Sequence, residues 1–237
     1  MLRDLKSIKL IEVPGHCFAA ELSYDLALCW DRLVPEQVVQ KVPGLIGLAL
    51  TARGYGRCTG GHHSGNCNSI VASIGEFLDQ NESTRVRVLC VCSDEVDGDV
   101  RLSRHIADRF AKWRDRIDIV VYDRQGIEHF LALIRQCSLV IASRMHAGIM
   151  AMNASIPVYQ ISYAEKITSF FEHCGLSTTY LYTHDQVTTE SLTTFLRKGL
   201  SNELESFSSA QSASLLKKGD IVYSDLLRLL PSSPTGW

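Results

Sequence analysis

The feature that most constrains the fold is a strict alternation of short apolar runs with longer segments of helical period, which begins at Val42. The apolar runs cover 45–50, 86–92, 117–122, 139–142 and 157–161, with a shorter one at 178–182. Helical segments follow at 68–78, 102–113, 127–135, 143–152 and 164–174, and 185–230 is helical with a Ser-rich break near 206–214. Parallel strands need crossover connections, which are usually helices. The pattern therefore predicts an α/β fold, a Rossmann-like parallel sheet with helices on both faces.

Residues 1–41 do not follow this alternation. They contain one strand-like run, Ile8 to Val13, and an Asp-containing apolar piece, Leu22 to Trp30. We interpret 1–41 as the end of a preceding unit with a linker, 42–230 as one Rossmann-like ligand-binding domain, and 231–237 as a disordered tail.

The composition gives evidence on the partners that the protein binds and on the compartment in which it functions. With 24 Lys and Arg against 26 Asp and Glu, the net charge of −2 gives no basic field that would attract nucleic acid or an anionic membrane. No apolar run approaches the roughly 18 residues of a membrane span. The first seven residues lack the features of a signal peptide. Eight cysteines are scattered along the chain, and Cys90 and Cys92 lie inside an apolar run. We therefore expect a cytoplasmic protein with reduced thiols.

Polar residues follow the fourth apolar run, where a parallel sheet would bind its ligand. Ser143, Arg144 and His146 stand at the start of the next helical segment. Free N–H groups and the helix dipole favour an anion at such a helix start. Arg144 adds a fork suited to phosphate or carboxylate, and His146 can transfer protons near neutral pH. In the alternative interpretation, Arg144 pairs with a carboxylate of the protein and His146 caps or packs.

Two more cations fall near the same edge of the expected sheet. Arg53 follows the first apolar run, so in a parallel sheet it would converge with Arg144 on one cleft. Two such arginines suit a ligand with two anionic groups; the alternative is a solvated loop arginine. Lys166 begins the helix after the fifth run and can screen a phosphate, unless it is an ordinary surface lysine.

The Gly-rich segment after the first run contains four residues that could ligate zinc, namely Cys58, His62, His63 and Cys67. Structural zinc sites usually place two close pairs across a longer loop, and this spacing does not. We predict no metal site and a flexible loop over the cleft. No Gly-x-Gly-x-x-Gly or P-loop pattern occurs, which disfavours a dinucleotide or ATP.

One stretch of about thirty residues resembles the polysaccharide pyruvyl transferase family. It carries a Ser-Arg-Leu-His type motif, a proline on the following strand and a Tyr-x-x-Lys element. The corresponding segments are Ser143-Arg-Met-His-Ala-Gly148, Ile156-Pro-Val158, Ile161-Ser-Tyr-Ala-Glu-Lys166 and Phe170-Phe171.

A weaker resemblance extends from residue 1 to about residue 230. Arg3-Asp4 with Ser7 is similar to the family's Arg-Asp/Glu-x-x-Ser element, and Tyr24-Asp-Leu-Ala-Leu28 is similar to its Asp-Pro-Ala-Phe stretch. Arg53 stands where the family has an arginine at the end of the first strand of its C-terminal domain.

The resemblance implies the C-terminal half of a glycosyltransferase-B-like fold and a transferase that needs no cofactor. Phosphoenolpyruvate would be the donor, and a sugar hydroxyl of a polysaccharide or its lipid-linked precursor the acceptor, giving a pyruvyl ketal.

Arg53 and Arg144 would bind the donor's anionic groups, with the N–H groups of Met145 and His146 completing the cradle. His146 would act as acid or phosphate partner. Ser143, Tyr163 and Lys166 would contribute to substrate binding, and polysaccharide assembly enzymes are the expected protein partners.

The resemblance implies that residues 1–34 correspond to the last piece of the family's N-terminal domain, so we expect this sequence to lack nearly all of that domain. We therefore expect the isolated chain to bind phosphoenolpyruvate weakly and to transfer pyruvate slowly at most. Apolar residues of that piece, including Leu26, Leu28 and Trp30, are expected to be poorly ordered or docked on a neighbour. Two alternatives stay open: a nucleotide-sugar-dependent glycosyltransferase or epimerase of the same architecture, and a truncated domain that only binds a partner.

Overall fold

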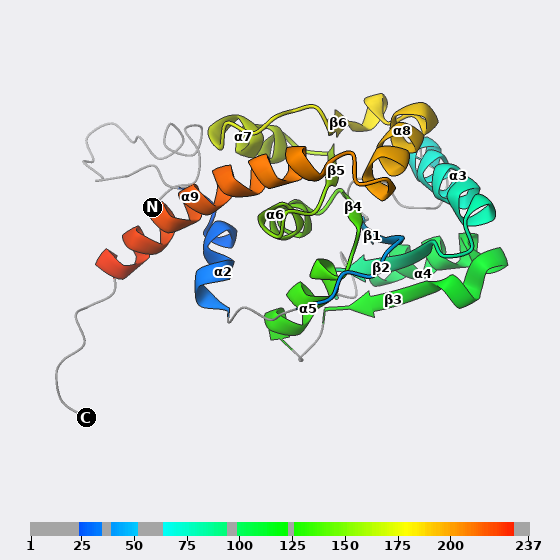
Figure 1. Ribbon diagram of the computed structural model, residues 1–237, viewed down its shortest axis with the longest axis horizontal. Coiled ribbons are helices and arrows are strands. Elements are labelled where there is room, and N and C mark those ends of the chain that lie inside the picture. The colour runs from blue at the N-terminus through cyan, green and yellow to red at the C-terminus, as the bar shows by residue number, and fades with distance from the viewer. Residues whose placement is uncertain (1–23, 35–38, 52–63, 94–98, 123–125, 230–237) are drawn as a thin grey trace.

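The computed structural model describes residues 24–34, 39–51, 64–93, 99–122 and 126–229 (Figure 1). Six strands form one sheet in the order β3-β2-β1-β4-β5-β6, and every neighbouring pair is parallel. The strands are β1 (Leu45–Ala49), β2 (Arg85–Cys90), β3 (Ile117–Val121), β4 (Leu139–Ala142), β5 (Val158–Ser162) and β6 (Leu181–Thr183). This is the usual Rossmann strand order. The predicted α/β fold is confirmed.

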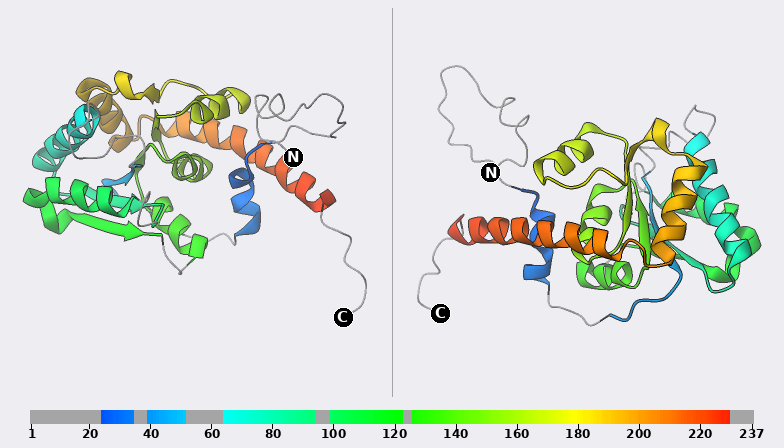
Figure 2. Two further views of the ribbon diagram at one scale, coloured as in Figure 1. Left: turned by 180° about the vertical axis from the view of Figure 1, so that it is seen from behind. Right: turned by 45° about the horizontal axis from the view of Figure 1, so that its top comes forward.

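Helices cover both faces of the sheet (Figure 2). One face carries α3 (Ser64–Gln80), α4 (Val100–Arg109) and α8 (Thr189–Leu200). The other carries α5 (Gly126–Arg135), α6 (Met145–Asn153), α7 (Glu165–His173) and α9 (Glu205–Leu229). Short 3-10 turns, η3 (Ala111–Arg116) and η4 (His184–Gln186), precede β3 and α8. No helix in the described ranges is long and apolar enough to cross a membrane.

The central strand β1 shows why this sequence forms a two-faced sheet. All five of its residues are buried. Leu45 and Ala49 belong to the core under α5, α6 and α9, whereas Ile46 and Leu48 belong to the core under α3, α4 and α8. Alternate side chains of a strand point to opposite faces, so a continuous apolar run is what a strand covered on both sides requires.

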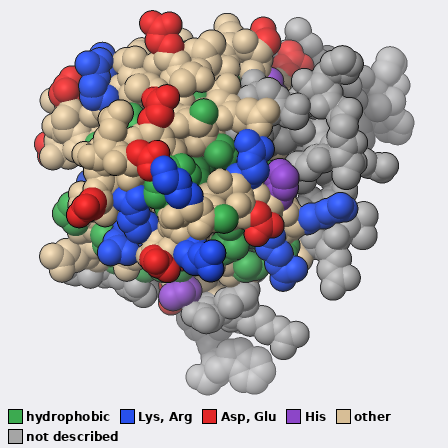
Figure 3. Space-filling view, turned by 90° about the vertical axis from the view of Figure 1, so that its right-hand side faces the viewer, with side chains coloured by type: hydrophobic (Ala, Val, Ile, Leu, Met, Phe, Trp, Pro, Cys, Tyr) green, Lys and Arg blue, Asp and Glu red, His purple; other side chains and the backbone are tan. Residues whose placement is uncertain are grey.

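The surface on the side of α3 and α4 carries mixed charge. Figure 3 shows basic and acidic side chains interspersed there. Lys112 Nζ lies 2.6 Å from Asp79 Oδ1, which also accepts a hydrogen bond from Trp113 Nε1 at 2.9 Å. The hydrogen bond from Lys112 is the main reason why the pKa of Asp79 lies below its ordinary value.

The expected break near 206–214 is wrong, because those residues lie inside α9. The serines there use their hydroxyls within the fold: Ser208 Oγ donates to the carbonyl of Glu205, and Ser212 Oγ donates to the carbonyl of Asn153 on α6 at 2.7 Å. The chain turns earlier, at 201–204, where Asn202 has a φ of +63°.

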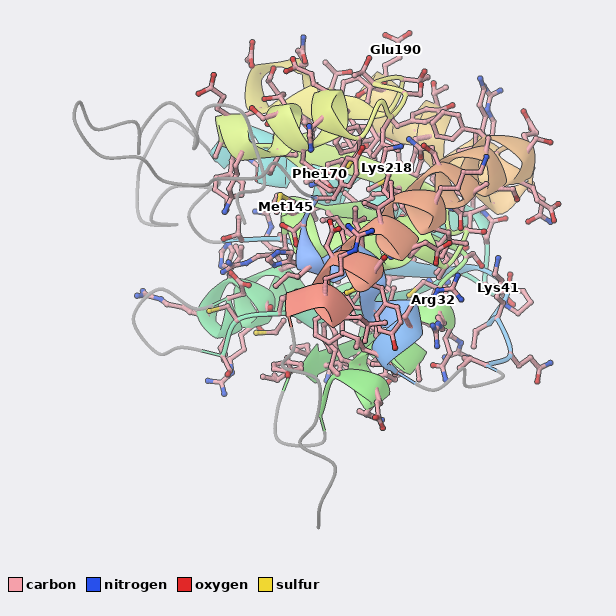
Figure 4. The ribbon with its side chains drawn as sticks, turned by 90° about the vertical axis from the view of Figure 1, so that its left-hand side faces the viewer. Arg32, Lys41, Met145, Phe170, Glu190 and Lys218 are labelled. Atoms are coloured by element: carbon pink, nitrogen blue, oxygen red, sulfur yellow. The ribbon has the colours of Figure 1, made fainter. Side chains whose placement is uncertain are left out.

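The segment before the sheet packs on this domain rather than standing apart from it. It forms η1 (Leu26–Cys29) and α2 (Trp30–Leu33), which contact α6 and α9. Leu28 is 1% exposed, so its expected disorder or docking on a neighbour is wrong. The reason is that α9 returns across this segment, as Figure 4 shows beside Arg32 and Lys218, and Arg32 pairs with Asp220 at 2.5 Å. Leu26 remains 56% exposed.

Candidate functional site

The strand order places the switch point of this sheet between β1 and β4, and ligands of such folds bind outside the carboxyl ends of these strands. We call this expected ligand position the β1–β4 crevice. The chain leaves β1 toward α3 on one face and leaves β4 toward α6 on the other, which is the arrangement that opens a ligand site in such folds. The N–H groups of Ser143 and Arg144 both donate to the carbonyl of Ala49, at 2.9 and 3.1 Å. The Ser143 hydroxyl accepts from the N–H of Thr51 at 2.9 Å. Ser143, a predicted substrate-binding residue, is fully buried and ties the two strand ends together.

Arg144 stands immediately before α6 and makes a two-pronged ion pair with Asp99. Its Nε donates to Asp99 Oδ2 at 2.7 Å and its Nη2 donates to Asp99 Oδ1 at 2.6 Å. Burial alone would lower the pKa of Arg144, but the hydrogen bonds and the negative charge of Asp99 outweigh it, so the pKa is raised. The side chain of Arg144 is 20% exposed and that of Asp99 is 0% exposed. The carboxylate pairing weighed from the sequence is therefore present.

His146, in the first turn of α6, is half exposed and faces Asp25. Its Nε2 lies 3.7 Å from Asp25 Oδ1, which also accepts the N–H of Ala27 at 3.0 Å. Asp25 thus caps η1 and approaches the histidine with the same oxygen. The fold thereby joins the two segments that carry the family resemblance, Tyr24–Leu28 and Ser143–Gly148.

A cavity of about 430 Å³ adjoins His146. Its walls come from η1 and α2, from the residues just after β2 and β3, and from α5 and α6. The lining is Asp25, Leu26, Ala27, Trp30, Val91, Tyr122, Ile127, Phe130, His146 and Met150. Because these residues come from separate segments and are mostly apolar, no motif in the sequence indicates this cavity.

The other predicted site residues divide into buried and exposed groups. Met145, the first residue of α6, is 7% exposed and belongs to the core under α5, α6 and α9, so only its backbone can serve a ligand (Figure 4). Tyr163 and Lys166 follow β5, and Lys166 Nζ lies 5.6 Å from the centre of the Tyr163 ring. The half-buried Tyr163 and the exposed Lys166 lie at the carboxyl end of the strand next to β4.

Several residues named from the sequence lie outside the described residues. These are Arg53, Cys58, His62 and His63, and the side chain of Cys67 at the start of α3 is likewise not described. Within the described ranges there is no group of three or more His, Cys, Asp or Glu residues placed to hold a metal ion.

Gly148 allows α6 to lie close to β5. A Cβ at this position would stand 2.0 Å from Oε1 of Gln160, a buried side chain whose Nε2 donates to the carbonyl of Ala142 at 3.0 Å. The glycine of the Ser143–Gly148 motif therefore seats the helix whose first turn carries His146.

Asp99 and Asp25 are the residues of the site that sequence reasoning missed. Each belongs to a segment already singled out: Asp99 directly follows the turn-like stretch 93–98 after the second apolar run, and Asp25 lies in Tyr24–Leu28. A weak signal was available for Asp99, because it follows a strand that ends at the same edge as β4.

The sheet order and the helices on both faces define a Rossmann-like α/β domain, and solved structures of glycosyltransferase-B-like fold are similar to it. MnaA of S. aureus, solved with UDP, has a TM-score of 0.58 at 10% identity, over 93% of this chain and 57% of its own. A candidate UDP-N-acetylglucosamine 2-epimerase from Listeria monocytogenes has a TM-score of 0.53 at 16% identity, over 78% of this chain and 43% of its own.

A UDP-forming α,α-trehalose-phosphate synthase from Burkholderia xenovorans, solved with glucose-6-phosphate, also has a TM-score of 0.53, at 11% identity over 80% of this chain and 43% of its own. At these identities the likeness shows the fold alone, and the chain spans about half the length of these proteins. The model of the polysaccharide pyruvyl transferase family matches residues 1–165. The chain therefore belongs to the polysaccharide pyruvyl transferase family. A search of curated proteins found no significant match.

Proposed function

We propose that the β1–β4 crevice binds phosphoenolpyruvate and that this chain serves pyruvyl transfer to a sugar hydroxyl, which forms a pyruvyl ketal. Membership of the family supports the transferase class. The observation that carries the proposal is the placement of Arg144 and His146 around the start of α6, at the switch point of the sheet. One small anion would then contact the guanidinium of Arg144, the imidazole of His146 and the N–H groups at the start of α6.

The chemistry proposed for this site is the following. A proton adds to the methylene carbon of phosphoenolpyruvate, and one sugar hydroxyl bonds to C2 and loses its proton. A second hydroxyl of the same sugar then bonds to C2 as the C2–O bond to phosphate breaks, and its proton leaves with the phosphate. His146 is half exposed in the first turn of α6 and is the residue that we assign to proton transfer. A positioned general acid of this kind typically contributes about 10²–10⁴-fold in rate.

Cations other than Arg144 are needed to balance the charge of the proposed donor. Because Asp99 offsets the charge of Arg144, a donor with a phosphate and a carboxylate needs further positive charge nearby. We assign Lys166, after β5, and Arg53, after β1, to this role, with Tyr163 holding the lysine by its ring. The first-turn N–H groups of Met145 and His146 complete the cradle.

The proposed setting is the cytoplasm, with polysaccharide assembly enzymes as partners and a polysaccharide or its lipid-linked precursor as acceptor. Free cysteines support a reducing compartment; those described are Cys29, Cys90, Cys92, Cys137 and Cys174.

Transfer is tested by incubating the chain with phosphoenolpyruvate and a panel of methyl glycosides, and by measuring phosphate release together with the mass of each glycoside. We expect acceptor-dependent phosphate release and a glycoside that gains one pyruvyl group, even if turnover is slow. His146→Ala should lower the rate, whereas His105→Ala, at an exposed histidine of α4, should not. Phosphate release without a pyruvylated product, or turnover of a UDP-sugar in place of phosphoenolpyruvate, would overturn the proposal.

A further inference from the structure

The guanidinium of Arg144 is divided into two edges by its contact with Asp99. The carboxylate occupies the side edge, formed by Nε and Nη2. Among the described residues, the hydrogen bonds of this guanidinium come from those two nitrogens, so the end edge, formed by Nη1 and the second N–H of Nη2, remains for another partner. A second planar anion can therefore bind end-on while the ion pair with Asp99 stays intact.

Asp99 is itself held firmly. Its N–H donates to the carbonyl of Cys92 at 2.7 Å, and its Oδ2 accepts the N–H of Cys92 at 3.3 Å. Its carbonyl accepts the N–H of Ser103 at 2.8 Å, which fixes the residue at the start of α4. Since the side chain of Asp99 is fully buried, swinging it away from Arg144 to admit a ligand would separate a buried ion pair, which is costly.

The pair also spans the crevice. Asp99 follows β2, Arg144 follows β4, and β1 lies between those two strands in the sheet. The contact therefore fixes the position of a β4 residue from the opposite side of the switch point, where the ligand is expected to lie.

We propose that Asp99 is a positioning residue that holds Arg144 with its end edge toward the crevice, so that Arg144 binds the donor end-on through Nη1 and Nη2. The inference rests on the proposed function for the identity of the donor. If the inference holds, Asp99 affects ligand binding only through Arg144. A residue that merely stabilises the fold would not show this dependence on Arg144.

A double-mutant cycle on phosphoenolpyruvate affinity tests this dependence, with calorimetric titration of the wild type, Asp99→Asn, Arg144→Gln and the double variant. Asn keeps the size of Asp99 but removes its charge and one acceptor. We expect Asp99→Asn to weaken binding about tenfold in the wild-type background and by less than about twofold beside Arg144→Gln, as for two residues of one network.

The matched control is another Arg–Asp pair, one that lies within the sheet. Arg87 Nε donates to Asp118 Oδ2 at 2.9 Å, across β2 and β3 and below the carboxyl edge. Asp118→Asn should leave phosphoenolpyruvate affinity unchanged. Equal losses for Asp99→Asn and Asp118→Asn, or an equal loss from Asp99→Asn in both Arg144 backgrounds, would overturn the proposal.

A measurement without ligand separates this inference from the proposed function. In ¹⁵N NMR spectra of arginine side chains, the Nε–H of Arg144 should exchange slowly with water in the wild type and quickly in Asp99→Asn, while the Nε–H of Arg87 is unchanged. Slow exchange in both proteins would show that Asp99 does not hold Arg144. If the wild type binds no phosphoenolpyruvate although its Nε–H is protected, the proposed function fails and the ion pair stands.

Should Asp99→Asn not fold, Arg144→Lys tests the other half of the proposal, end-on binding by the fork, because lysine keeps the charge but cannot make a two-pronged contact. We expect the lysine variant to fold and to lose at least about tenfold in phosphoenolpyruvate affinity, because it loses a bidentate contact. Unchanged affinity in that variant would likewise contradict end-on binding by a positioned fork.

Discussion

Replacing Gly148 by alanine sets two effects of opposite sign against each other. In a helix interior, alanine is favoured over glycine by about 1 kcal/mol. The new Cβ would, however, stand 2.0 Å from Gln160 Oε1 and 3.2 Å from its Cδ, so the Gln160 side chain has to move. Gln160 is 1% exposed and has little room to move.

The cost of that movement exceeds the gain. Overpacking a core costs about 1–3 kcal/mol, and breaking the bond from Gln160 Nε2 to the carbonyl of Ala142 costs about 1–3 kcal/mol more, because both groups are buried. Subtracting the helix gain, we expect Gly148→Ala to lower the free energy of unfolding by about 1–5 kcal/mol.

Urea unfolding of four proteins measures this: the wild type, Gly148→Ala, Gln160→Ala and the double variant. If the close approach of Gln160 is the cause, Gly148→Ala should be nearly neutral, or stabilising by up to about 1 kcal/mol, once Gln160 is truncated. A stabilising Gly148→Ala in the wild-type background, or the same destabilisation in both backgrounds, would refute the reasoning.

Three further predictions concern the docked segment, the proton-transfer residue and a buried thiol. Gly219→Ala would bring a Cβ within 2.3 Å of the carbonyl oxygen of Leu28, so α9 should move off η1 and limited proteolysis should cut the N-terminal segment faster; an unchanged cutting rate would contradict this packing. His146→Ala should reduce turnover more than phosphoenolpyruvate affinity in paired kinetic and calorimetric measurements, whereas equal losses would assign His146 to holding phosphate. Burial raises the pKa of Cys137 from 9.0 to about 12, so its thiol should resist a maleimide at about pH 8 until the chain unfolds. The contribution of Cys137 to stability should decline as pH rises above 9.0, because the thiol then ionises in the unfolded chain but not in the folded one. Labelling of Cys137 in the native protein, detected by mass spectrometry, would contradict this.

The sheet could be predicted from the sequence because its central strands β1, β4 and β5 are buried on both sides. Runs such as Leu45–Leu50 and Leu139–Ala142 are apolar without alternation and are separated by helical periods, so their parallel arrangement follows from chain connectivity. The same reasoning placed Arg144 and His146 at the carboxyl edge. Prediction from the local pattern failed where tertiary packing overrides it. The serines at 206–214 favour a break, yet the hydroxyls of Ser208 and Ser212 form hydrogen bonds within a continuous helix and to α6.

The partners of the site residues could not be predicted, because they are set by contacts between distant segments. Asp99 is 45 positions from Arg144 in the sequence, and nothing in local pattern distinguishes it from the acidic residues just before it. The meeting of Asp25 with His146 depends on α9 holding η1 against α6. Contacts between such distant segments can be identified only in the folded structure. The types of residue that follow each strand can be read from the sequence alone.

We propose that the guanidinium of Arg144 binds phosphoenolpyruvate at the β1–β4 crevice, and the rest of the proposed function depends on this binding. Its most direct test is calorimetric titration of the chain with phosphoenolpyruvate and, separately, with UDP-N-acetylglucosamine, repeated for Arg144→Lys and for Arg104→Lys at an exposed arginine of α4. We expect saturable binding of phosphoenolpyruvate in preference to the nucleotide sugar. We also expect a loss of affinity of at least about tenfold for Arg144→Lys, and no loss for Arg104→Lys. Preference for the nucleotide sugar, or equal phosphoenolpyruvate affinity in the two lysine variants, would contradict binding by Arg144.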